Sequence, residues 1–404
     1  MATMLVAALA LSGLRGLETR NYKHRLENFN NMQYLGRMSI GPFNVTGIFD
    51  TGSFDLLVMS TRCGHCANQK YDHSQSSTYQ ADPEGLRVRH SFGSGQVISR
   101  RGYERVQAGT LVADKQEIWE IEDHDIPALD VSGCDAIVGV GPTQGPGDSR
   151  LQGEKTLLMN FAVDRFSVCL ERGGLTKPGW FEWQGQRGTK GDSAFVSAPV
   201  VGKHHWVVKQ TAVKARTPDG ALEDTGLCTD GCGAIVDSGT SMILVPSKHI
   251  KVLAKYIQIK TDCSNLKQLP TLHLTLGGHT TAIPPRAYVL RVKKSDGSFR
   301  CRSGISTLEK QSQVGPVWVL GLPFMREYVT VFDRTERQVR FAVAAQDCSI
   351  LPFKDASTTP APTTNTSLVL HHAQEQEDDE APEVDERLNL YPSWARAGGV
   401  NIEL

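Results

Sequence analysis

The chain has 404 residues, of which 40% are hydrophobic and 22% charged, so it is long enough for two hydrophobic cores of ordinary domain size. Its formal net charge is −1 at pH 7, which gives no indication of nucleic acid or an anionic membrane as a partner. No apolar run approaches the roughly 18 residues that a membrane-spanning helix needs. The composition therefore argues against a nucleic-acid-binding protein and against a membrane anchor.

The N-terminus begins with a short apolar run at residues 4–11 that ends in small residues. Such a run is typical of the core of a signal peptide. We therefore predict a signal peptide over residues 1–16, with cleavage near Gly13 or Gly16. No Lys or Arg precedes the run, so an amphipathic or disordered start is the alternative.

Residues 32–345 consist of short runs rich in Val, Ile, Leu, Thr and Tyr, separated by Gly, Pro, Asn and Asp. This pattern is typical of a mainly β protein. Two segments depart from it. Residues 246–259 have an amphipathic pattern that predicts a helix starting at a Ser cap, and residues 156–163 predict a second helix.

Two segments, 49–53 and 236–240, nearly repeat each other as FDTGS and VDSGT. Each follows one apolar run and precedes another. Asp50 and Asp237 are 187 residues apart (237 minus 50), about the length of a compact half-protein. One such loop would be an ordinary turn, because Asp, Thr and Gly favour turns. Two copies at this spacing predict two lobes that each supply one carboxylate to a shared site.

Two carboxyl groups that face one water molecule can hydrolyse a peptide bond without a covalent intermediate. One group deprotonates the water while the other protonates the carbonyl oxygen. Like charges about 3 Å apart cannot both ionise, so the pair keeps one proton and titrates as a unit. Gly52 and Gly239 allow a tight turn and close approach of backbone amides. Neighbouring hydroxyls are expected to hold the carboxylates in place: those of Thr51, Ser53, Ser238 and Thr240.

The cysteines cluster around these two loops. Cys63 and Cys66 follow the first loop, Cys228 and Cys232 precede the second, and Cys263 with Cys301 could close a further loop. This spacing favours disulfides and an oxidising compartment. A metal site at Cys63, His65 and Cys66 is the alternative, but the sequence lacks a second Cys or His pair at suitable spacing.

Further short motifs occur in a fixed order along the chain, at residues 32–36, 39–41, 91–95, 135–139, 318–321 and 331–333. Together with the two Asp loops, they make residues 31–348 resemble the pepsin-like aspartic proteinases, the family of pepsin and cathepsin D. The resemblance implies a mainly β, bilobal fold with the active site in a cleft between the lobes. The implied N-terminal lobe covers residues 31–185 and the C-terminal lobe residues 186–348.

The resemblance also assigns roles to residues. It implies that Asp50 and Asp237 are catalytic and that an extended peptide is bound by Gly52, Gly239, Thr240, Phe92, Gly93 and Ser94. It implies the disulfides Cys63–Cys66, Cys228–Cys232 and Cys263–Cys301, and no metal or organic cofactor. The pairing of Cys134, Cys169 and Cys348 stays open: one of them is free, or one pair is unusual.

Residues 17–30 occupy the place of the family's propeptide, whose basic residues pair with the catalytic carboxylates. Arg20, Lys23, His24 and Arg25 could do this here. The segment is short for a propeptide, so a solvated linker without inhibitory role is an equal alternative.

The sequence departs from the family at the flap, the hairpin that includes residues 91–95. Phe92 stands where the family usually has Tyr, and Leu57 stands where it has the Trp that bonds this Tyr. Loss of both partners of a hydrogen bond can be nearly neutral. We expect a more mobile flap and a roomier pocket on the amino side of the scissile bond. A second departure, Leu322 in place of Asp, is expected to raise the pH optimum.

The C-terminal segment has a different composition. Residues 356–367 resemble an O-glycosylated stalk, and residues 375–386 form an acidic run that cannot build a core. We predict that residues 349–404 are a disordered tail. Asn365 is an expected N-glycosylation acceptor; Asn44 also matches the acceptor pattern but is better explained as a strand position.

The sequence as a whole predicts an aspartic endopeptidase that acts on proteins or peptides at acidic pH. We expect it to be monomeric, and secreted or located in a lysosomal or vacuolar lumen. The alternative is a pepsin-fold binding or inhibitor protein with weak or no catalysis. The altered flap and the short propeptide favour this alternative, and the two intact Asp loops count against it.

Overall fold

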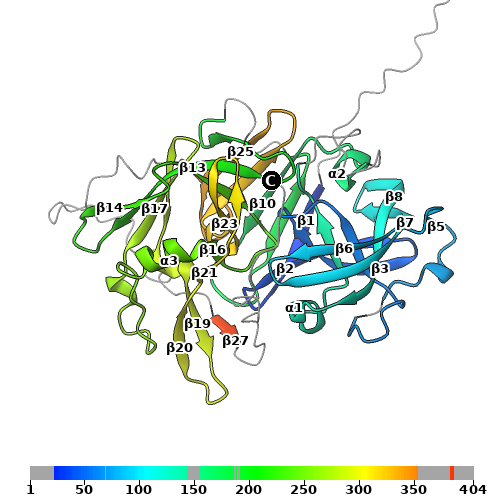
Figure 1. The fold of residues 1–404 in the computed structure, drawn as a ribbon, viewed down its shortest axis with the longest axis horizontal. Coiled ribbons are helices and arrows are strands. Elements are labelled where there is room, and N and C mark those ends of the chain that lie inside the picture. Colours follow the sequence, from blue (N-terminus) through cyan, green and yellow to red (C-terminus); the bar gives the residue numbers. More distant parts are fainter. Residues whose placement is uncertain are drawn as a thin grey trace, which may run out of the picture.

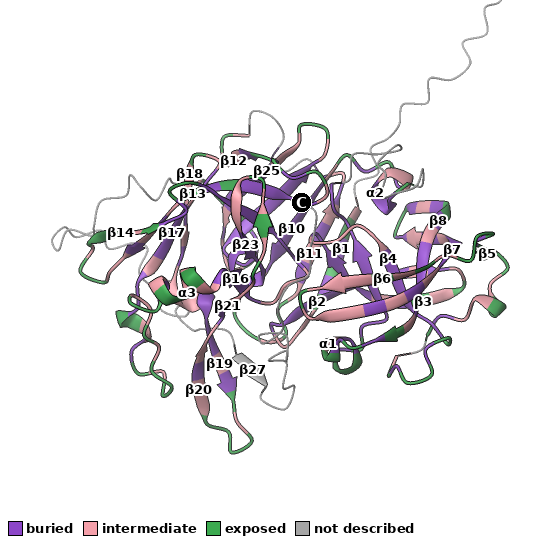
Figure 2. Ribbon diagram, in the orientation of Figure 1, coloured by how far each residue is buried: buried purple, intermediate pink, exposed green. Residues whose placement is uncertain are grey.

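The computed structural model describes residues 22–68, 70–142, 155–185, 188 and 192–353, and the backbone of 383–385. The predicted signal peptide, Arg20 and Asn365 lie outside these residues. The fold is mainly β, as predicted, and Figure 1 shows two lobes that share a central set of strands. Figure 2 shows that buried residues follow the strands and that exposed ones gather in turns and loops.

The first lobe is formed by the segments between residues 33 and 160. Its elements are β2 (Gln33–Ile40), β3 (Phe43–Asp50), β4 (Leu56–Met59), η1 (His73–Gln75), β5 (Gln80–Ala81), β6 (Arg87–Phe92), β7 (Gly95–Ala108), β8 (Leu111–His124), α1 (Pro127–Val131), β9 (Ala136–Gly139) and α2 (Leu157–Asn160).

The central strands join the two lobes. They are β1 (Tyr22–Phe29), β10 (Arg165–Leu170), β11 (Gly179–Trp183), β12 (Val196–Pro199), β24 (Tyr328–Asp333), β25 (Gln338–Ala344) and β26 (Ile350–Leu351). They pair in the order β12-β25-β24-β10-β11-β1 and continue into the first lobe through β2. Strands from both ends of the chain therefore lie in one sheet.

The strands of the second lobe are β13 (Val207–Arg216), β14 (Leu222–Leu227), β15 (Cys232–Val236), β16 (Ile243–Val245), β17 (Thr271–Leu276), β18 (His279–Ile283), β19 (Val289–Lys293), β20 (Phe299–Ser303), β21 (Ile305–Thr307), β22 (Gln311–Ser312) and β23 (Gly315–Leu320). Its main sheet has the order β18-β17-β13-β15-β23-β16-β21, and β19 and β20 pair in a separate, smaller sheet. Its helices are α3 (Ser247–Leu253), η2 (Leu266–Gln268), α4 (Pro285–Tyr288) and α5 (Leu322–Met325).

The same three-strand unit occurs once in each lobe. In the first lobe, β9 pairs parallel with β3 and antiparallel with β4. In the second lobe, β23 pairs parallel with β15 and antiparallel with β16. The loop between the two outer strands of each unit contains one of the repeated Asp-Thr/Ser-Gly segments, so the repeat in the sequence corresponds to a repeat in the fold.

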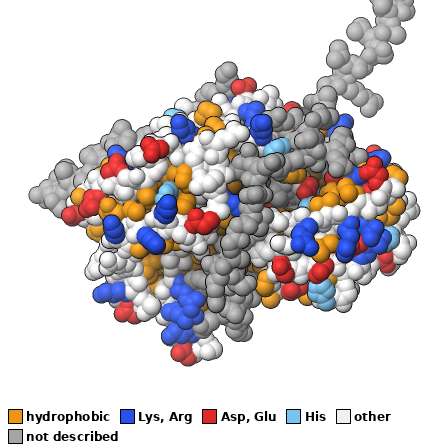
Figure 3. All heavy atoms as spheres, viewed as in Figure 1, with side chains coloured by type: hydrophobic (Ala, Val, Ile, Leu, Met, Phe, Trp, Pro, Cys, Tyr) orange, Lys and Arg blue, Asp and Glu red, His pale blue; other side chains and the backbone are white. Residues whose placement is uncertain are grey.

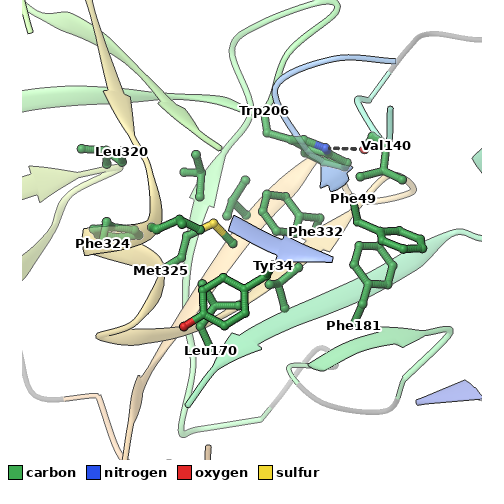
Figure 4. Close-up of a cluster of buried hydrophobic side chains, with 14 of the residues drawn as sticks. Tyr34, Phe49, Val140, Leu170, Phe181, Trp206, Leu320, Phe324, Met325 and Phe332 are labelled. Atoms are coloured by element: carbon green, nitrogen blue, oxygen red, sulfur yellow. Dashed lines mark hydrogen bonds between the residues drawn. The ribbon is translucent and has the colours of Figure 1, made fainter. Parts of the chain in front are cut away.

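One aromatic core extends beneath both units (Figure 4). The ring centroid of Phe49, the residue before Asp50, lies 5.1 Å from that of Phe181. The rings of Phe332 and Phe166 stack with their centroids 4.8 Å apart. The indole of Trp206 packs against Phe332 and donates to the carbonyl of Val140 at 2.9 Å. Rings of this size bury large apolar areas and prefer such tilted or offset contacts, so the strands that end at the two loops rest on a common support.

Two predicted helices are shorter than expected. The helix predicted at 246–259 is α3, which covers only Ser247–Leu253 and has Pro246 rather than Ser at its N-cap. Ile257 and Ile259 both pack against the core, two positions apart, a spacing that suits extended rather than helical chain. The helix predicted at 156–163 is α2, Leu157–Asn160, preceded by Thr156.

The described part of the segment predicted at 17–30 is β1. Tyr22–Phe29 pairs with β11 on one side and with β2 on the other, so this part is not a solvated linker. Lys23 and Arg25 are exposed, and His24 is buried and accepts from the amide of Arg37 at 3.1 Å. Because side chains of a strand alternate between its faces, Lys23 and Arg25 lie on one face of the sheet and His24 on the other. An inhibitory role for the segment stays a prediction.

The segment predicted as a disordered tail contains two short strands in its described part. Ile350–Leu351 extends the central sheet beside β25. β27 (Glu383–Asp385) pairs in parallel with β19. An exposed sheet edge offers unpaired backbone groups to any extended segment, which is the physical reason why a segment without its own core can still form a strand.

All three predicted disulfides form, Cys63–Cys66, Cys228–Cys232 and Cys263–Cys301. A fourth joins Cys169 of β10 to Cys348 and spans 179 residues. Cys134 is the free cysteine; it is buried, and its thiol donates to the carbonyl of Ala136 at 3.1 Å. The fourth disulfide links the central strand β10 to the segment that follows β25.

The described surface has no extended apolar patch. Its exposed large hydrophobic residues are Val131, Val201, Leu222 and Leu351, which belong to different elements. Figure 3 shows hydrophobic, acidic and basic side chains interspersed over one face. Among the described residues, no helix is long and apolar enough to cross a membrane.

Candidate active site

The first Asp loop leaves the end of β3. The backbone of Asp50 is fixed by β9, since the carbonyl of Asp50 accepts from the amide of Val140 at 2.9 Å. Its carboxylate is fixed from within the loop. The amide of Gly52 donates to Oδ1 at 2.8 Å and the hydroxyl of Ser53 donates to Oδ2 at 2.5 Å. Each oxygen therefore has its own donor, which sets the plane of the carboxylate.

The second loop repeats this arrangement atom for atom. The amide of Gly239 donates to Oδ1 of Asp237 at 2.8 Å, and the hydroxyl of Thr240 donates to Oδ2 at 2.5 Å. The amide of Asp237 donates to the carbonyl of Leu320 on β23 at 3.1 Å. Of the four hydroxyls predicted to hold the carboxylates, those of Ser53 and Thr240 thus contact them directly.

The remaining two hydroxyls link one loop to the other. Thr51 Oγ1 donates to the carbonyl of Val236 at 2.9 Å and accepts from the amide of Ser238 at 2.9 Å. In return, Ser238 Oγ donates to the carbonyl of Phe49 at 2.5 Å and accepts from the amide of Thr51 at 3.1 Å. These bonds are buried, so breaking one would leave polar groups without water. They hold the two loops at a fixed separation.

The two carboxylates face each other at the point where the loops meet. A Cβ atom added to Gly52 would lie 2.7 Å from Cγ of Asp237, and one added to Gly239 would lie 2.6 Å from Cγ of Asp50. Each glycine therefore makes room for the carboxylate of the other lobe. Burial, followed by the nearby charge of Asp237, raises the pKa of Asp50 well above its usual value. This arrangement favours a proton shared by the pair.

The flap residues lie apart from the loops, at the tip of the β6–β7 hairpin. Phe92 is opposite Gly95 in register, and Gly93 and Ser94 form the turn between them. Phe92 is half-buried and packs against an apolar cluster that includes Leu57. The structure thus brings together Asp50, Asp237 and their loop neighbours, and places the predicted flap contacts on a separate element.

Leu57 and Leu322, the two leucines that depart from the family pattern, are both buried. Leu57 is fully buried and lies in register with Trp119, on the neighbouring strand β8. The indole of Trp119 donates to Glu117 at 3.2 Å, so a Trp is present one strand away from the expected position. Leu322 is also buried, and its amide donates to the carbonyl of Thr240 at 2.8 Å, which places it directly beneath the second loop.

One contact that crosses between the lobes has no signal in the sequence. His205 Nδ1 donates to the carbonyl of Gly52 at 2.8 Å. It precedes Trp206, whose indole bonds Val140 next to the first loop. The run His204-His205-Trp206 is unusual in a chain with 12 His and 6 Trp, but only the fold shows that it lies against a loop some 150 residues earlier.

Two groups of residues in the described part of the chain could in principle hold a metal ion. They are Cys63 with His65 and Cys66, and Cys228 with Cys232 and His249. In both groups the two cysteines form a disulfide. A disulfide has no thiolate, and thiolate is the form of cysteine that binds metals.

Comparison with known proteins agrees with this geometry. The sequence pattern of the eukaryotic aspartyl protease family matches residues 33–344. The chain belongs to the eukaryotic aspartyl protease family. Similar proteins include cathepsin D of Chionodraco hamatus, 31% identical over 344 residues that cover 79% of this chain and 83% of the relative. Pepsin A of Canis lupus familiaris is 30% identical over 349 residues, with 79% and 83% covered. Vacuolar protease A of Aspergillus fumigatus is 30% identical over 340 residues, with 79% and 81% covered.

Membership of this family makes the chain an aspartic-type endopeptidase, which acts on protein or peptide substrates. The matched region includes both Asp loops, the flap hairpin and the central strands from β10 to β25. The resemblance stated from the motifs is therefore confirmed at the level of family and fold.

Proposed function

We propose that this aspartyl protease hydrolyses peptide bonds with one water molecule activated between Asp50 and Asp237. The observation that carries the proposal is the reciprocal packing of the two loops. Each carboxylate receives an amide and a hydroxyl from its own loop and lies against the glycine of the other. Two identical carboxylates supported in this way face a common point, where a water molecule can contact both.

Burial and the charge of Asp237 raise the pKa of Asp50, which favours one proton shared by the pair. The ionised carboxylate of the pair takes a proton from the water as the water oxygen attacks the peptide carbonyl carbon. The protonated carboxyl group gives its proton to the carbonyl oxygen, which forms a neutral tetrahedral diol. The carboxyl group that took the water proton then passes it to the amide nitrogen, which allows the C–N bond to break. The other carboxylate takes a proton from a diol hydroxyl as the new carboxyl group forms, so the dyad again holds one proton.

Substrate would lie across the two loops in an extended conformation, beneath the flap. Gly52, Gly239 and Thr240 supply backbone and hydroxyl groups at the dyad, and Phe92, Gly93 and Ser94 supply the cover. Phe92 is an apolar lid without a hydroxyl. The glycines suit this role because a backbone without Cβ can approach a peptide closely.

The disulfides and the dyad support a proposal for the cellular compartment of the protein. Four disulfides favour the oxidising secretory pathway. A dyad that must keep one proton works at acidic pH, so we propose a secreted, lysosomal or vacuolar location. One relative has a name that places it in a vacuole.

The test is cleavage of a denatured general protein substrate from pH 3 to pH 7, by the wild type, Asp50→Asn and Asp237→Asn. We expect acid-dependent cleavage that both substitutions abolish. Asp296→Asn is a matched control, since Asp296 is exposed in the turn between β19 and β20. Folded wild type without activity at any pH would favour the alternative, a binding protein with a pepsin fold and the altered flap.

A further inference from the structure

The flap also contacts the first catalytic loop, through a residue close to the tip of the hairpin. His90 is on β6, two residues before Phe92. Its Nδ1 lies 3.2 Å from Oδ2 of Asp55, and its Nε2 lies 2.8 Å from Oγ of Ser99 on β7. Asp55 belongs to the first catalytic loop, five residues after Asp50. One imidazole therefore joins both flap strands to the loop that holds a catalytic carboxylate.

The imidazole is enclosed on a third side by Trp119. The two rings meet edge to face, with centroids 5.0 Å apart and planes at 75°. Only 10% of the His90 side chain and 23% of the Asp55 side chain are exposed. Because Trp119 is itself held by Glu117, His90 has little freedom to leave its position. A polar contact shielded in this way is stronger than one at the surface.

The contact reaches the catalytic carboxylate through the backbone. The carbonyl of Asp55 accepts from the amide of Gly139 at 2.8 Å, and the next amide, that of Val140, donates to the carbonyl of Asp50 at 2.9 Å. The loop and β9 are packed tightly here, since a Cβ on Gly139 would meet the amide nitrogen of Asp55 at 2.5 Å. A shift of Asp55 would therefore move the backbone segment of β9 that holds Asp50 in place.

We propose that His90 is a positioning residue that fixes the flap over the first catalytic loop through Asp55. The inference rests on the proposed function, because it names the element that orders the substrate cover of that same site. Nδ1–H donates to the carboxylate of Asp55, which can only accept when ionised, and Nε2 bonds the Ser99 hydroxyl, which can donate or accept. A carboxylate that orients an imidazole in this way is a common supporting contact.

Among the described residues, the other contacts of the flap do not reach the catalytic loop. Phe92 packs on apolar side chains. The amide of Gln96 on β7 donates to Oδ1 of Asp125 at 2.5 Å, and the amide of Asp125 donates to the carbonyl of Gln96 at 3.1 Å. These bonds hold the flap to the segment after β8, whereas His90 holds it to Asp55. His90 therefore positions the hairpin relative to the first catalytic loop.

A double-mutant cycle tests the proposal. The variants are His90→Gln, Asp55→Asn and the double variant, assayed on an extended peptide that spans the flap and on a short peptide that reaches only the dyad. For the extended peptide we expect each single variant to raise KM about tenfold with kcat changed much less. The double variant should be no worse than either single one. For the short peptide, KM should change little.

His65→Gln is the matched control. His65 also pairs with an aspartate, Asp123, at 3.3 Å in the same lobe, but on a different loop. It should leave both substrates unaffected. If His90→Gln does not fold, Ser99→Ala removes one contact of the same imidazole and should raise KM for the extended peptide in the same direction.

Two results would overturn the proposal: unchanged KM for the extended peptide in His90→Gln, or fully additive effects in the double variant. Both differ from failure of the proposed function. In that case the wild type itself would be inactive, or Asp50→Asn would retain activity.

Discussion

The two catalytic loops are nearly identical in their inner contacts and different in what surrounds them. In each, the aspartate accepts from an amide two residues on and from a hydroxyl three residues on, at matching distances. Within the part of the chain that the structure describes, only the first loop contacts the β6–β7 hairpin through His90 and Asp55 and receives the bond from His205. The second loop rests on α5, with Leu322 beneath it.

This difference separates two tasks. The chemistry needs two equivalent carboxylates, and the repeated three-strand unit supplies them. Substrate access needs a cover on one side, and only the first lobe supplies it. We therefore expect substitutions in the shared elements to act equally in both lobes, and substitutions around the first loop to act on substrate preference.

The largest expected effect concerns the two glycines. Gly52→Ala and Gly239→Ala each place a Cβ within 2.7 Å of the opposite carboxyl carbon. A displacement of about 1 Å in a catalytic group can cost about 100-fold in rate, so we expect each variant to lose at least about that much kcat. Gly64→Ala is the control, since a Cβ there meets nothing within 4 Å. A large loss in one variant and none in the other would contradict the equivalence of the loops.

The next effect concerns the hydroxyls that link the loops. Thr51→Val and Ser238→Ala each leave buried backbone groups unpaired, which should lower the free energy of unfolding by about 2–3 kcal/mol. Because the two residues share partners, the double variant should lose less than the sum. Chemical denaturation of the three variants gives the answer, and unequal single losses with full additivity would disprove a reciprocal link.

The flap substitutions sharpen the difference between the lobes. Leu57→Trp adds a large ring at a fully buried position beside Trp119, so overpacking should destabilise the protein by about 1–3 kcal/mol. Phe92→Tyr adds one hydroxyl at a half-buried position and should change stability much less. Thermal unfolding and kinetics on a panel of peptides would check both. If both variants match the wild type in rate and preference, the expectation of a more mobile flap and a roomier pocket fails.

The smallest effect is a pH dependence of stability, to which one histidine of the central sheet and one of the second lobe contribute. Burial lowers the pKa of His24 in β1 and of His273 in β17 to about 4. Each contributes stability above its unfolded pKa of about 6.5, and this contribution is lost as the pH falls through 4. His24→Gln and His273→Gln should therefore each reduce the drop in melting temperature between pH 7 and pH 4, by about one to two degrees. The exposed His65→Gln should follow the wild type; a variant curve that also coincides with the wild type would refute the burial effect.

The local features of the site could be predicted from the sequence. The Asp loops carry their supporting glycines and hydroxyls within three residues, and Cys63–Cys66 and Cys228–Cys232 are equally local. Such contacts need no knowledge of the fold. The flap position of Phe92 followed from the order of the motifs along residues 31–348.

Contacts that depend on strand register could not be predicted. Trp119 lies beside Leu57 only because β8 pairs in parallel with β4, and His90 meets Asp55 across 35 residues. The bond between Cys169 and Cys348 requires that β10 and the segment after β25 lie close together. β1 does have a signal in the sequence, since His24 and Leu26 alternate with charged residues, and a period of two is typical of a strand. The basic charge of the same residues favours a propeptide instead, so the two signals conflict.

The central claim is that Asp50 and Asp237 share one proton, and titration of the Asp50 carboxyl carbon tests it most directly. The measurement is ¹³C NMR of protein labelled at the aspartate carboxyls, with the Asp50 signal assigned by its loss in Asp50→Asn. We predict that Asp50 titrates well above its usual pKa of 3.8, and that Asp237→Asn lowers this pKa while leaving it raised by burial. An Asp50 that titrates near 3.8 in the wild type, or that does not respond to Asp237→Asn, would contradict the account.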